Sequence, residues 1–271
     1  MVAQGTLTPE DFKMSGQLGP RALNVLIRVQ ELVSARGPYA YVEIGSYLGR
    51  SLQPHVQDAA CTRAVSIDLR PDVVSDERGD LDMYKGITAD DMVRGLSEVC
   101  SQEQLGKLEA VTANSDALRV REGETFDLAF IDGEHTNTAV FRDFLNVLRV
   151  LSGDGVICFD DTSLVLPGIL NALAVLDDRG IAHAHVFGKG NITVVALGDG
   201  AQAFVDGLGE GLTIPEARAV RRAQRRMMDI ALGSVKPHQV ADHSTLMPGV
   251  VRHLRNDGWT VEPALAEVGV E

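Results

Sequence analysis

The stretch FDLAFIDGEHTNTAVFRDFLNVLRVLSGDGVICFDDT, residues 126–162, contains two short apolar runs that each end in acidic residues. The first run, 127–131, is followed at once by Asp132, and the second, 156–159, is followed by an acidic pair. Short apolar runs bounded by turn residues are typical of buried parallel strands. Between the runs, apolar residues recur at helical spacing, so the stretch predicts a strand, a helix and a second strand.

The acidic residues after the two runs are expected to lie close together. A right-handed crossover brings the ends of two parallel strands to one edge of the sheet, where open α/β sheets bind ligands. Three carboxylates in one place repel one another unless protons or a cation compensate, and Mg²⁺ and Ca²⁺ prefer such oxygen ligands. Asp132, Asp160 and Asp161 are therefore candidate metal ligands. The alternative is that the later pair caps the next segment or borders a loop.

His135 follows Asp132 by three residues, on the turn that leaves the first strand. An unperturbed histidine titrates near ~6.5, so its neutral ring can accept a proton from a substrate hydroxyl. The alternative is a loop histidine without a chemical role. The neighbouring acids favour a catalytic base.

Length and charge limit the function classes. A chain of 271 residues is long enough for one large α/β domain with additions at its ends. Its net charge of −13 argues against a nucleic-acid partner, because such binding depends on Lys and Arg, and favours a small neutral or cationic substrate. No apolar run approaches the ~20 residues of a membrane span. Without a visible secretory signal, and with three widely spaced cysteines, a cytoplasmic protein is expected.

The segment YAYVEIGSYLGRS, residues 39–51, predicts a strand, a glycine loop and the start of a helix. Gly45 and Gly49 allow a sharp turn and a close approach to a ligand, and Glu43 at the strand end can accept hydrogen bonds. The spacing E-x-G-x-x-x-G differs from the dinucleotide fingerprint G-x-G-x-x-G. It favours a ligand with an amine and a ribose, although a plain strand-to-helix turn is the alternative.

Two later strand ends carry further polar residues. Asp68 follows the apolar run 64–67 and is placed to accept ribose hydroxyls, unless it merely starts an acidic loop. After the predicted strand 108–112, the polar residues 114–116 lie at the same edge and could meet an adenine.

These motifs resemble those of the class I S-adenosylmethionine-dependent methyltransferases over roughly residues 39–197. VEIGSYLGRS is similar to the family's first motif, SID to its second and NSD to its adenine-side loop. The resemblance implies a doubly wound, Rossmann-like α/β fold with a mostly parallel seven-stranded sheet whose last strand is antiparallel. It also implies that the donor, S-adenosylmethionine, is bound by Glu43, Gly45, Ser46, Gly49, Ser51, Asp68, Ser115, Asp116 and Asp132.

Within that superfamily, IDGEH followed by FDD resembles the metal-dependent O-methyltransferases. The catechol type carries a lysine three residues after the first ligand and usually an Asp-Asn pair later. Here these positions hold His135 and an Asp-Asp pair, which is closer to the macrocin and mycinamicin sugar O-methyltransferases. The resemblance therefore implies Mg²⁺-dependent methylation of a hydroxyl on a sugar or sugar-bearing small metabolite, in natural product biosynthesis. The alternatives are a catechol-type enzyme with a phenolic acceptor and a non-catalytic protein that binds S-adenosylmethionine or a nucleotide.

The expected layout is an N-terminal helical cap (1–38), the S-adenosylmethionine-binding domain (39–200) and a C-terminal helical extension packed on it (201–271). The acidic stretch 69–89 predicts either a lid or a solvated loop. A helix over 215–232 carries five arginines, which indicate a solvated basic face rather than an anion-binding surface. Homo-oligomerisation is left open.

Overall fold

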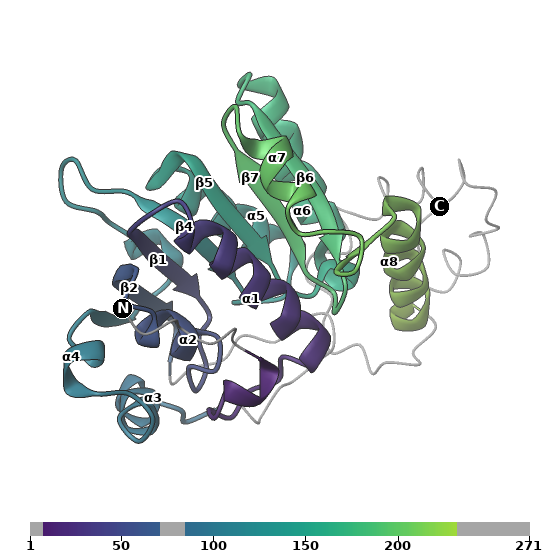
Figure 1. Ribbon diagram of the computed structural model, residues 1–271. Helices are drawn as coiled ribbons and strands as arrows, with labels where there is room; N and C mark the ends of the chain where they lie inside the picture. The colour runs from purple at the N-terminus through teal and green to yellow at the C-terminus, as the bar shows by residue number, and fades with distance from the viewer. Residues whose placement is uncertain (1–7, 71–84, 232–271) are drawn as a thin grey trace.

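The computed structural model describes residues 8–70 and 85–231, and its strands form one sheet in the order β3-β2-β1-β4-β5-β7-β6-β8 (Figure 1). Five strands are parallel: β1 (Tyr39–Ile44), β2 (Cys61–Asp68), β3 (Leu108–Thr112), β4 (Phe126–Ile131) and β5 (Leu151–Phe159). Antiparallel pairs join β5 to β7 (Thr193–Leu197), β7 to β6 (His183–Gly188) and β6 to β8 (Thr213–Ile214). The Rossmann-like methyltransferase fold is thus confirmed. The two-residue β8 makes eight strands in the described part of the chain, where seven were predicted.

The strand order explains where a ligand can bind. From β1 the chain proceeds outward to β2 and β3, then returns to β4 on the other side of β1. The direction of winding therefore reverses between β1 and β4, and ligands bind at such a switch point beyond the carboxyl ends of the strands. The glycine loop after β1 and the acidic turn after β4 both lie there.

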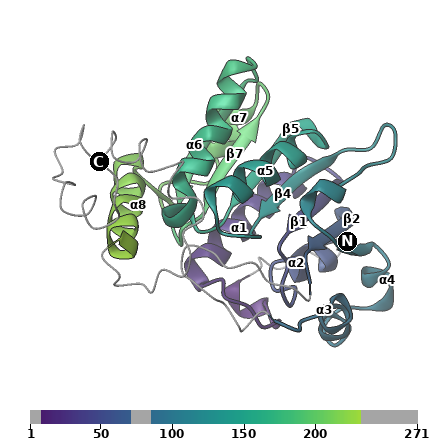
Figure 2. The same ribbon diagram turned by 180° about the vertical axis from the view of Figure 1, so that it is seen from behind.

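Helices cover both faces of the sheet (Figures 1 and 2). One apolar cluster joins the sheet to α1 (Pro20–Ser34), α2 (Leu52–Gln57), α3 (Ala89–Leu96) and α7 (Ala201–Asp206). The other joins its opposite face to α5 (Asn137–Leu148) and α6 (Thr162–Asp178). β1 contributes side chains to both clusters, with Tyr41 in the first and Val42 in the second, as expected of a strand buried on both sides.

Shorter elements complete the described chain. They are the 3₁₀ turns η1 (Pro9–Asp11) and η3 (Ser115–Ala117) and the short helix α4 (Gln102–Leu105). The predicted arginine-rich helix is α8 (Glu216–Ala231), which contacts α6. Its arginines Arg218, Arg221 and Arg225 are exposed, whereas Met227 and Ile230 are buried, so the solvated basic face is the better interpretation of the pattern.

One predicted boundary is wrong. The second apolar run was expected to form a strand over 156–159, but β5 begins at Leu151, which pairs with Phe126 before a register shift. The helix that follows this strand, α6, begins at Thr162, directly after the acidic pair. A non-helical Val165 separates its first turn from the remainder, so Pro167 still lies in the opening turn of the straight part. The acidic stretch 69–89 and the extension 201–271 fall largely outside the described residues.

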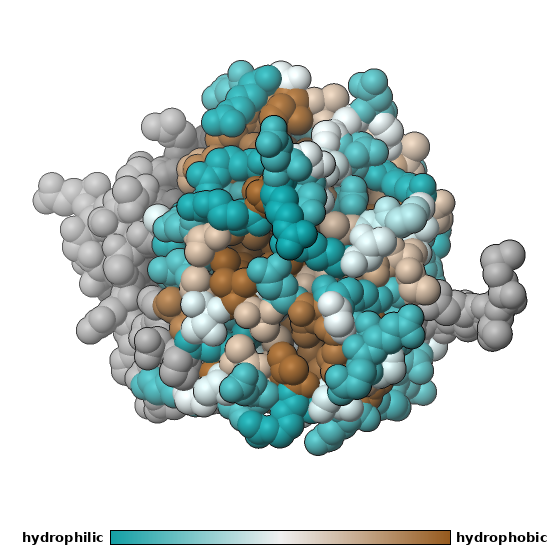
Figure 3. Space-filling view, turned by 90° about the vertical axis from the view of Figure 1, so that its left-hand side faces the viewer, coloured by the Kyte–Doolittle hydropathy of each residue, from teal (hydrophilic) through white to brown (hydrophobic). Residues whose placement is uncertain are grey.

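One face of the molecule, seen in Figure 3, is mostly polar. On the face in Figure 3, hydrophilic residues predominate and hydrophobic ones show between them in small areas. Among the described residues, Leu170 is the one large apolar side chain that is exposed. None of the described helices is long and apolar enough to cross a membrane.

Candidate active site

A cavity opens at the carboxyl edge of the sheet, beyond β1, β2, β4 and β5. The glycine loop after β1, Asp68 after β2, the turn 132–135 after β4 and the acidic pair after β5 all line it. Ser15–Leu18 from the N-terminal segment form a further wall. Residues predicted from separate motifs are therefore gathered around one space.

The glycine loop packs directly on the turn after β4. Gly45 has φ +81°, and a Cβ built on it would lie 2.1 Å from the carbonyl oxygen of Asp132 and 2.5 Å from Cα of Gly133. The amide of Asp132 in turn donates to Ile44 O at 2.8 Å. Glycine is required at position 45 by this backbone contact, whereas the sequence suggested approach to a ligand. Gly49, with φ +84°, is confined instead by Met92 and Leu96 of α3.

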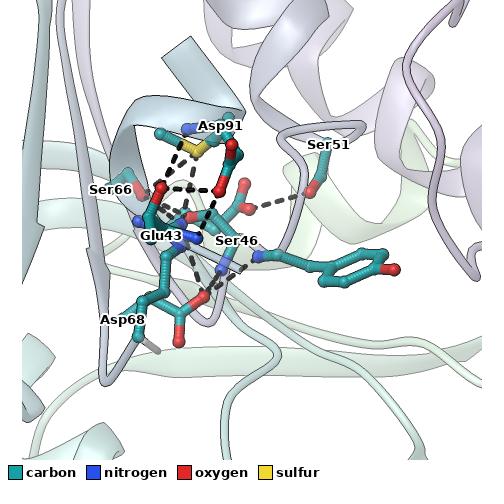
Figure 4. A network of polar contacts seen from close by, with 10 residues as sticks. Glu43, Ser46, Ser51, Ser66, Asp68 and Asp91 are labelled. Carbon is teal, nitrogen blue, oxygen red and sulfur yellow. Dashed lines mark hydrogen bonds and ion pairs between the residues drawn. The ribbon is translucent and has the colours of Figure 1, made fainter. Parts of the chain in front are cut away.

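Asp68 fixes the conformation of the glycine loop (Figure 4). Its Oδ2 accepts hydrogen bonds from the amides of Ser46, at 2.9 Å, and Tyr47, at 3.0 Å. The same oxygen lies 3.3 Å from a guanidinium nitrogen of Arg70, which also donates to Ser66 Oγ at 3.1 Å. Burial lowers the pKa of Arg70, and the neighbouring carboxylate opposes that shift. One edge of Asp68 is thus engaged by the protein itself.

Glu43 is not among the residues that line the cavity, and Figure 4 shows its carboxylate bonded to Ser51. It is fully buried, and its two carboxylate oxygens accept hydrogen bonds from Tyr41 Oη at 2.5 Å and Ser51 Oγ at 2.8 Å. Burial raises its pKa to about 7, against the opposing effect of these hydrogen bonds. Glu43 was assigned to the donor, but its position under the protein surface indicates that it supports the glycine loop through Ser51.

The predicted adenine side is built on two residues that the sequence analysis missed. Ser115 Oγ donates to Asp143 Oδ1 at 2.5 Å, and the Asn146 amide donates to Ser115 Oγ at 3.0 Å and to Asp116 Oδ1 at 2.8 Å. Burial raises the pKa of Asp143 to about 6. Ser115 lines the cavity, whereas the exposed Asp116 stands beside it. The sequence of α5 could have indicated these two residues, because Asp143 and Asn146 interrupt the apolar face of the helix.

The acidic cluster contains the predicted histidine. One donor atom each from Asp132, His135 and Asp160 lie within 4.8 Å of one another. His135 Nε2 is 3.1 Å from Asp132 Oδ1 and 3.6 Å from Asp161 Oδ2. Asp161 adopts a left-handed conformation, with φ +47°, and its Oδ1 accepts from Asn191 at 3.0 Å. The compact group is thus two acids and a histidine, and Asp161 joins it through His135.

The chemistry of this group suits a divalent cation. Burial raises the pKa of Asp132, and burial together with Asp132 and Asp161 raises the pKa of Asp160 well above its ordinary value. A cation would relieve that repulsion. Donor atoms around one Mg²⁺ or Ca²⁺, at about 2.0–2.6 Å from it, are at most about 5 Å apart. The observed spacing meets that limit.

Comparison with known proteins identifies the domain. Residues 42–162 match a family model described as a methyltransferase domain. No curated protein sequence matches the chain. Among solved structures, the calicheamicin methyltransferase CalS11 is 16% identical, with 67% of this chain and 82% of that chain covered and a TM-score of 0.50. The O-methyltransferase TomG from Streptomyces achromogenes, involved in tomaymycin synthesis, is 15% identical, with coverages of 66% and 82% and a TM-score of 0.47.

A second CalS11 structure, without ligand and described as a TDP-rhamnose 3'-O-methyltransferase, is 14% identical, with coverages of 67% and 82% and a TM-score of 0.48. At such identities a structural likeness shows the fold alone. The family match adds the methyltransferase domain, so the predicted enzyme, an S-adenosylmethionine-dependent methyltransferase, is confirmed. The macrocin-like branch, the metal, the site residues and the acceptor stay predictions.

Proposed function

We propose that this methyltransferase transfers a methyl group from S-adenosylmethionine to a hydroxyl oxygen of a sugar or sugar-bearing small metabolite, with a divalent cation in its active site. The observation that carries the proposal is the group formed by Asp132, His135 and Asp160 at the switch point of the sheet. It borders the same cavity as the glycine loop. Donor and acceptor can therefore meet beside a base and a cation site.

Asp132 and Asp160 would hold the cation, with Asp161 to complete the set of carboxylates, so that the His135 ring would receive a proton and not bind the cation. When bound there, a divalent cation supplies Lewis-acid stabilisation of negative charge on the acceptor oxygen. Mg²⁺ is the expected ion because its preferred ligands are carboxylate oxygens.

His135 is proposed as the general base. Its Nε2 faces two carboxylates, Asp132 Oδ1 and Asp161 Oδ2, which stabilise the ring once it carries a proton. In the transfer, the bond from the acceptor oxygen to the methyl carbon forms while the methyl–sulfur bond breaks. The hydroxyl proton passes to His135, and S-adenosylhomocysteine is released. The chain's remaining task is to align the three reacting atoms.

The glycine loop and its supports would provide that alignment. Asp68 accepts hydrogen bonds from two amides of the loop, and Gly45 allows the loop to pack closely on the Asp132 backbone. A donor bound on the loop would therefore be held at a set distance from the acidic cluster. Rigid support of this kind lowers the entropy lost on reaching the reactive geometry.

A sugar hydroxyl is favoured over a phenol by the residues at two positions. His135 and the Asp160-Asp161 pair replace the lysine and the Asp-Asn pair of the catechol-type pattern. The likeness to CalS11, whose ligand-free structure is described as a sugar O-methyltransferase, points the same way by analogy.

In the test, the purified protein is incubated with S-adenosylmethionine, Mg²⁺ and one of two sets of acceptors, nucleotide sugars or catechols. S-adenosylhomocysteine formation is measured by chromatography, and a mass increase of one methyl group is sought in each acceptor. Methylated nucleotide sugar supports the proposal. Methylated catechol alone would transfer the assignment to the phenolic class, and donor binding without turnover on either panel would favour a non-catalytic protein.

A further inference from the structure

The cavity has an unequal charge balance. Among the described residues, its charged lining consists of Asp68, Asp132, Glu134, Asp160 and Asp161 against the arginines Arg50 and Arg70, with His135 beside the acids. The donor required by the proposed function carries two cationic groups, its sulfonium and its amine, and one anion, its α-carboxylate. The acidic side chains suit the two cationic groups of the donor. The α-carboxylate of the donor needs a protein cation, because an unpaired negative charge in an acidic cavity is strongly disfavoured.

Arg70 is the less suitable of the two arginines. Its guanidinium lies 3.3 Å from the Asp68 carboxylate, and only 3% of its side chain is exposed. Two of its nitrogens, Nε and Nη1, are buried without a hydrogen-bond partner. Its charge is nevertheless already balanced by Asp68, so a second carboxylate gains less there.

Arg50 has no such carboxylate. The hydrogen bond given by its side chain is a long one, 3.4 Å from Nη1 to Gly16 O, and its Nε is buried without a partner. In the part of the chain that the structure describes, no acid lies within ion-pair distance of it. Of the two arginines that line the cavity among the described residues, Arg50 is therefore the one without a nearby carboxylate.

The surroundings hold Arg50 in place. Gly16 passes directly over its aliphatic stem, since a Cβ on Gly16 would be 2.7 Å from Arg50 Cβ and 2.9 Å from its Cδ. The N-terminal segment that carries Gly16 is anchored to α2 by the buried Gln53. Its Oε1 accepts from the amides of Lys13, at 2.7 Å, and Met14, at 3.1 Å, and its Nε2 donates to Asp11 O at 2.7 Å. A positioned guanidinium binds a carboxylate with little loss of side-chain entropy.

The position of Arg50 in the loop sets which end of the donor it meets. It directly follows Gly49 and precedes Ser51, in the glycine loop, and the family resemblance implies that Gly45, Ser46 and Gly49 of this loop lie under the methionine part of the donor. Ser115, which also lines the cavity, belongs to the segment expected to take the adenine. We propose that Arg50 binds the α-carboxylate of S-adenosylmethionine and so determines selectivity for an intact amino acid group on the donor. This inference rests on the proposed function.

The test compares S-adenosylhomocysteine with its decarboxylated analogue, S-adenosyl-3-thiopropylamine, by calorimetry. Charge-assisted hydrogen bonds to a carboxylate correspond to roughly a ten- to hundredfold change in affinity. Arg50→Gln should weaken binding of S-adenosylhomocysteine by that factor and leave binding of the analogue near that of wild type. Arg50→Lys should recover part of the loss, because it restores the charge without the guanidinium fork.

Two control variants separate local from general effects. Arg63→Gln removes a cation on β2 that pairs with Glu109 and Glu124 outside the cavity, so both affinities should persist. Arg70→Gln should not reproduce the selective loss. Thermal unfolding of each variant checks that the fold is retained.

Equal weakening of both ligands by Arg50→Gln would overturn the inference, because a structural role has that signature. If Arg50→Gln left both affinities unchanged but raised the KM for the acceptor, Arg50 would bind an anionic acceptor. That result would also overturn the inference. In both cases wild type still binds S-adenosylhomocysteine, so the proposed function stands. If wild type binds neither ligand, the proposed function and this inference fall together.

Discussion

Gly45 and Asp132 are in such close contact that a single added carbon on Gly45 would lie 2.1 Å from the carbonyl oxygen of Asp132. This contact joins the loop expected to carry the donor to the turn expected to hold the metal. The amide of Asp132 also donates a hydrogen bond to Ile44 O, so the two halves of the proposed reaction centre are packed directly against each other.

Gly45→Ala should therefore disturb both functions. The added methyl group meets backbone atoms and forces either a change of φ from +81° or a separation of the loop from the turn. We expect lower affinity for S-adenosylhomocysteine and a less stable fold. Gly123→Ala is the matched control, because Gly123 has φ +82° but a Cβ added to it would meet nothing within 4 Å. Equal effects of the two substitutions would show that the contact has no importance.

Glu43→Gln should change how stability depends on pH. Burial raises the pKa of folded Glu43 to about 7, above the 4.5 expected when unfolded. Its favourable contribution is thus complete below pH ~4.5 and is lost as the pH rises through 7. Wild type should lose up to about 3 kcal/mol relative to Glu43→Gln across that window. Denaturant unfolding at several pH values measures the difference, and a pH-independent difference would contradict the buried, protonated carboxyl.

Asn146→Ala should weaken donor binding through its neighbours. The Asn146 amide fixes Ser115 and Asp116 at the expected adenine end, so its loss should raise the Kd for S-adenosylhomocysteine by roughly two- to tenfold. Gln202→Ala provides the control, since that exposed amide bonds to Asp206 on the surface of α7. An unchanged Kd would place the adenine elsewhere.

His135→Ala should lower turnover by roughly 10²–10⁴-fold and leave the Kd for S-adenosylhomocysteine near that of wild type. The reason is that the ring receives the hydroxyl proton but does not support the glycine loop. Calorimetry with Mn²⁺ separates base from ligand, because a base can be lost without loss of metal affinity. His183→Ala, on β6 and outside the cavity, is the control. Turnover near that of wild type would reduce His135 to a loop residue.

The sequence predicted the fold and the edge of the sheet that carries the site because both depend on local patterns. Buried strands such as 126–131 are short apolar runs, and the polar residue after each one marks its end. The class of enzyme was predicted from the resemblance of the loop motifs to those of a known family. The start of β5 was predicted wrongly, but its carboxyl end at Phe159 was predicted correctly. The position of Asp160 just beyond the strand was therefore correct as well.

Contacts between distant residues were not predictable in this way. The bond from Asn191 to Asp161 joins residues 30 apart, and that from Asn146 to Asp116 also spans 30 residues. The clamp of Asp68 on the glycine loop depends on how β1 and β2 align. Likewise, the position of Gly16 over Arg50 has no sequence signature, since it arises when the N-terminal segment folds back onto α2.

The central claim is that methyl transfer requires a divalent cation held by the acids at the ends of β4 and β5. The most direct measurement is S-adenosylhomocysteine formation by chelator-treated protein with a methylatable nucleotide sugar, as Mg²⁺ is titrated back. Wild type should recover its rate, whereas Asp160→Asn should not, because one lost carboxylate leaves too little charge to hold Mg²⁺. An undiminished rate in excess chelator, or an Asp160→Asn variant as active as wild type, would contradict the account.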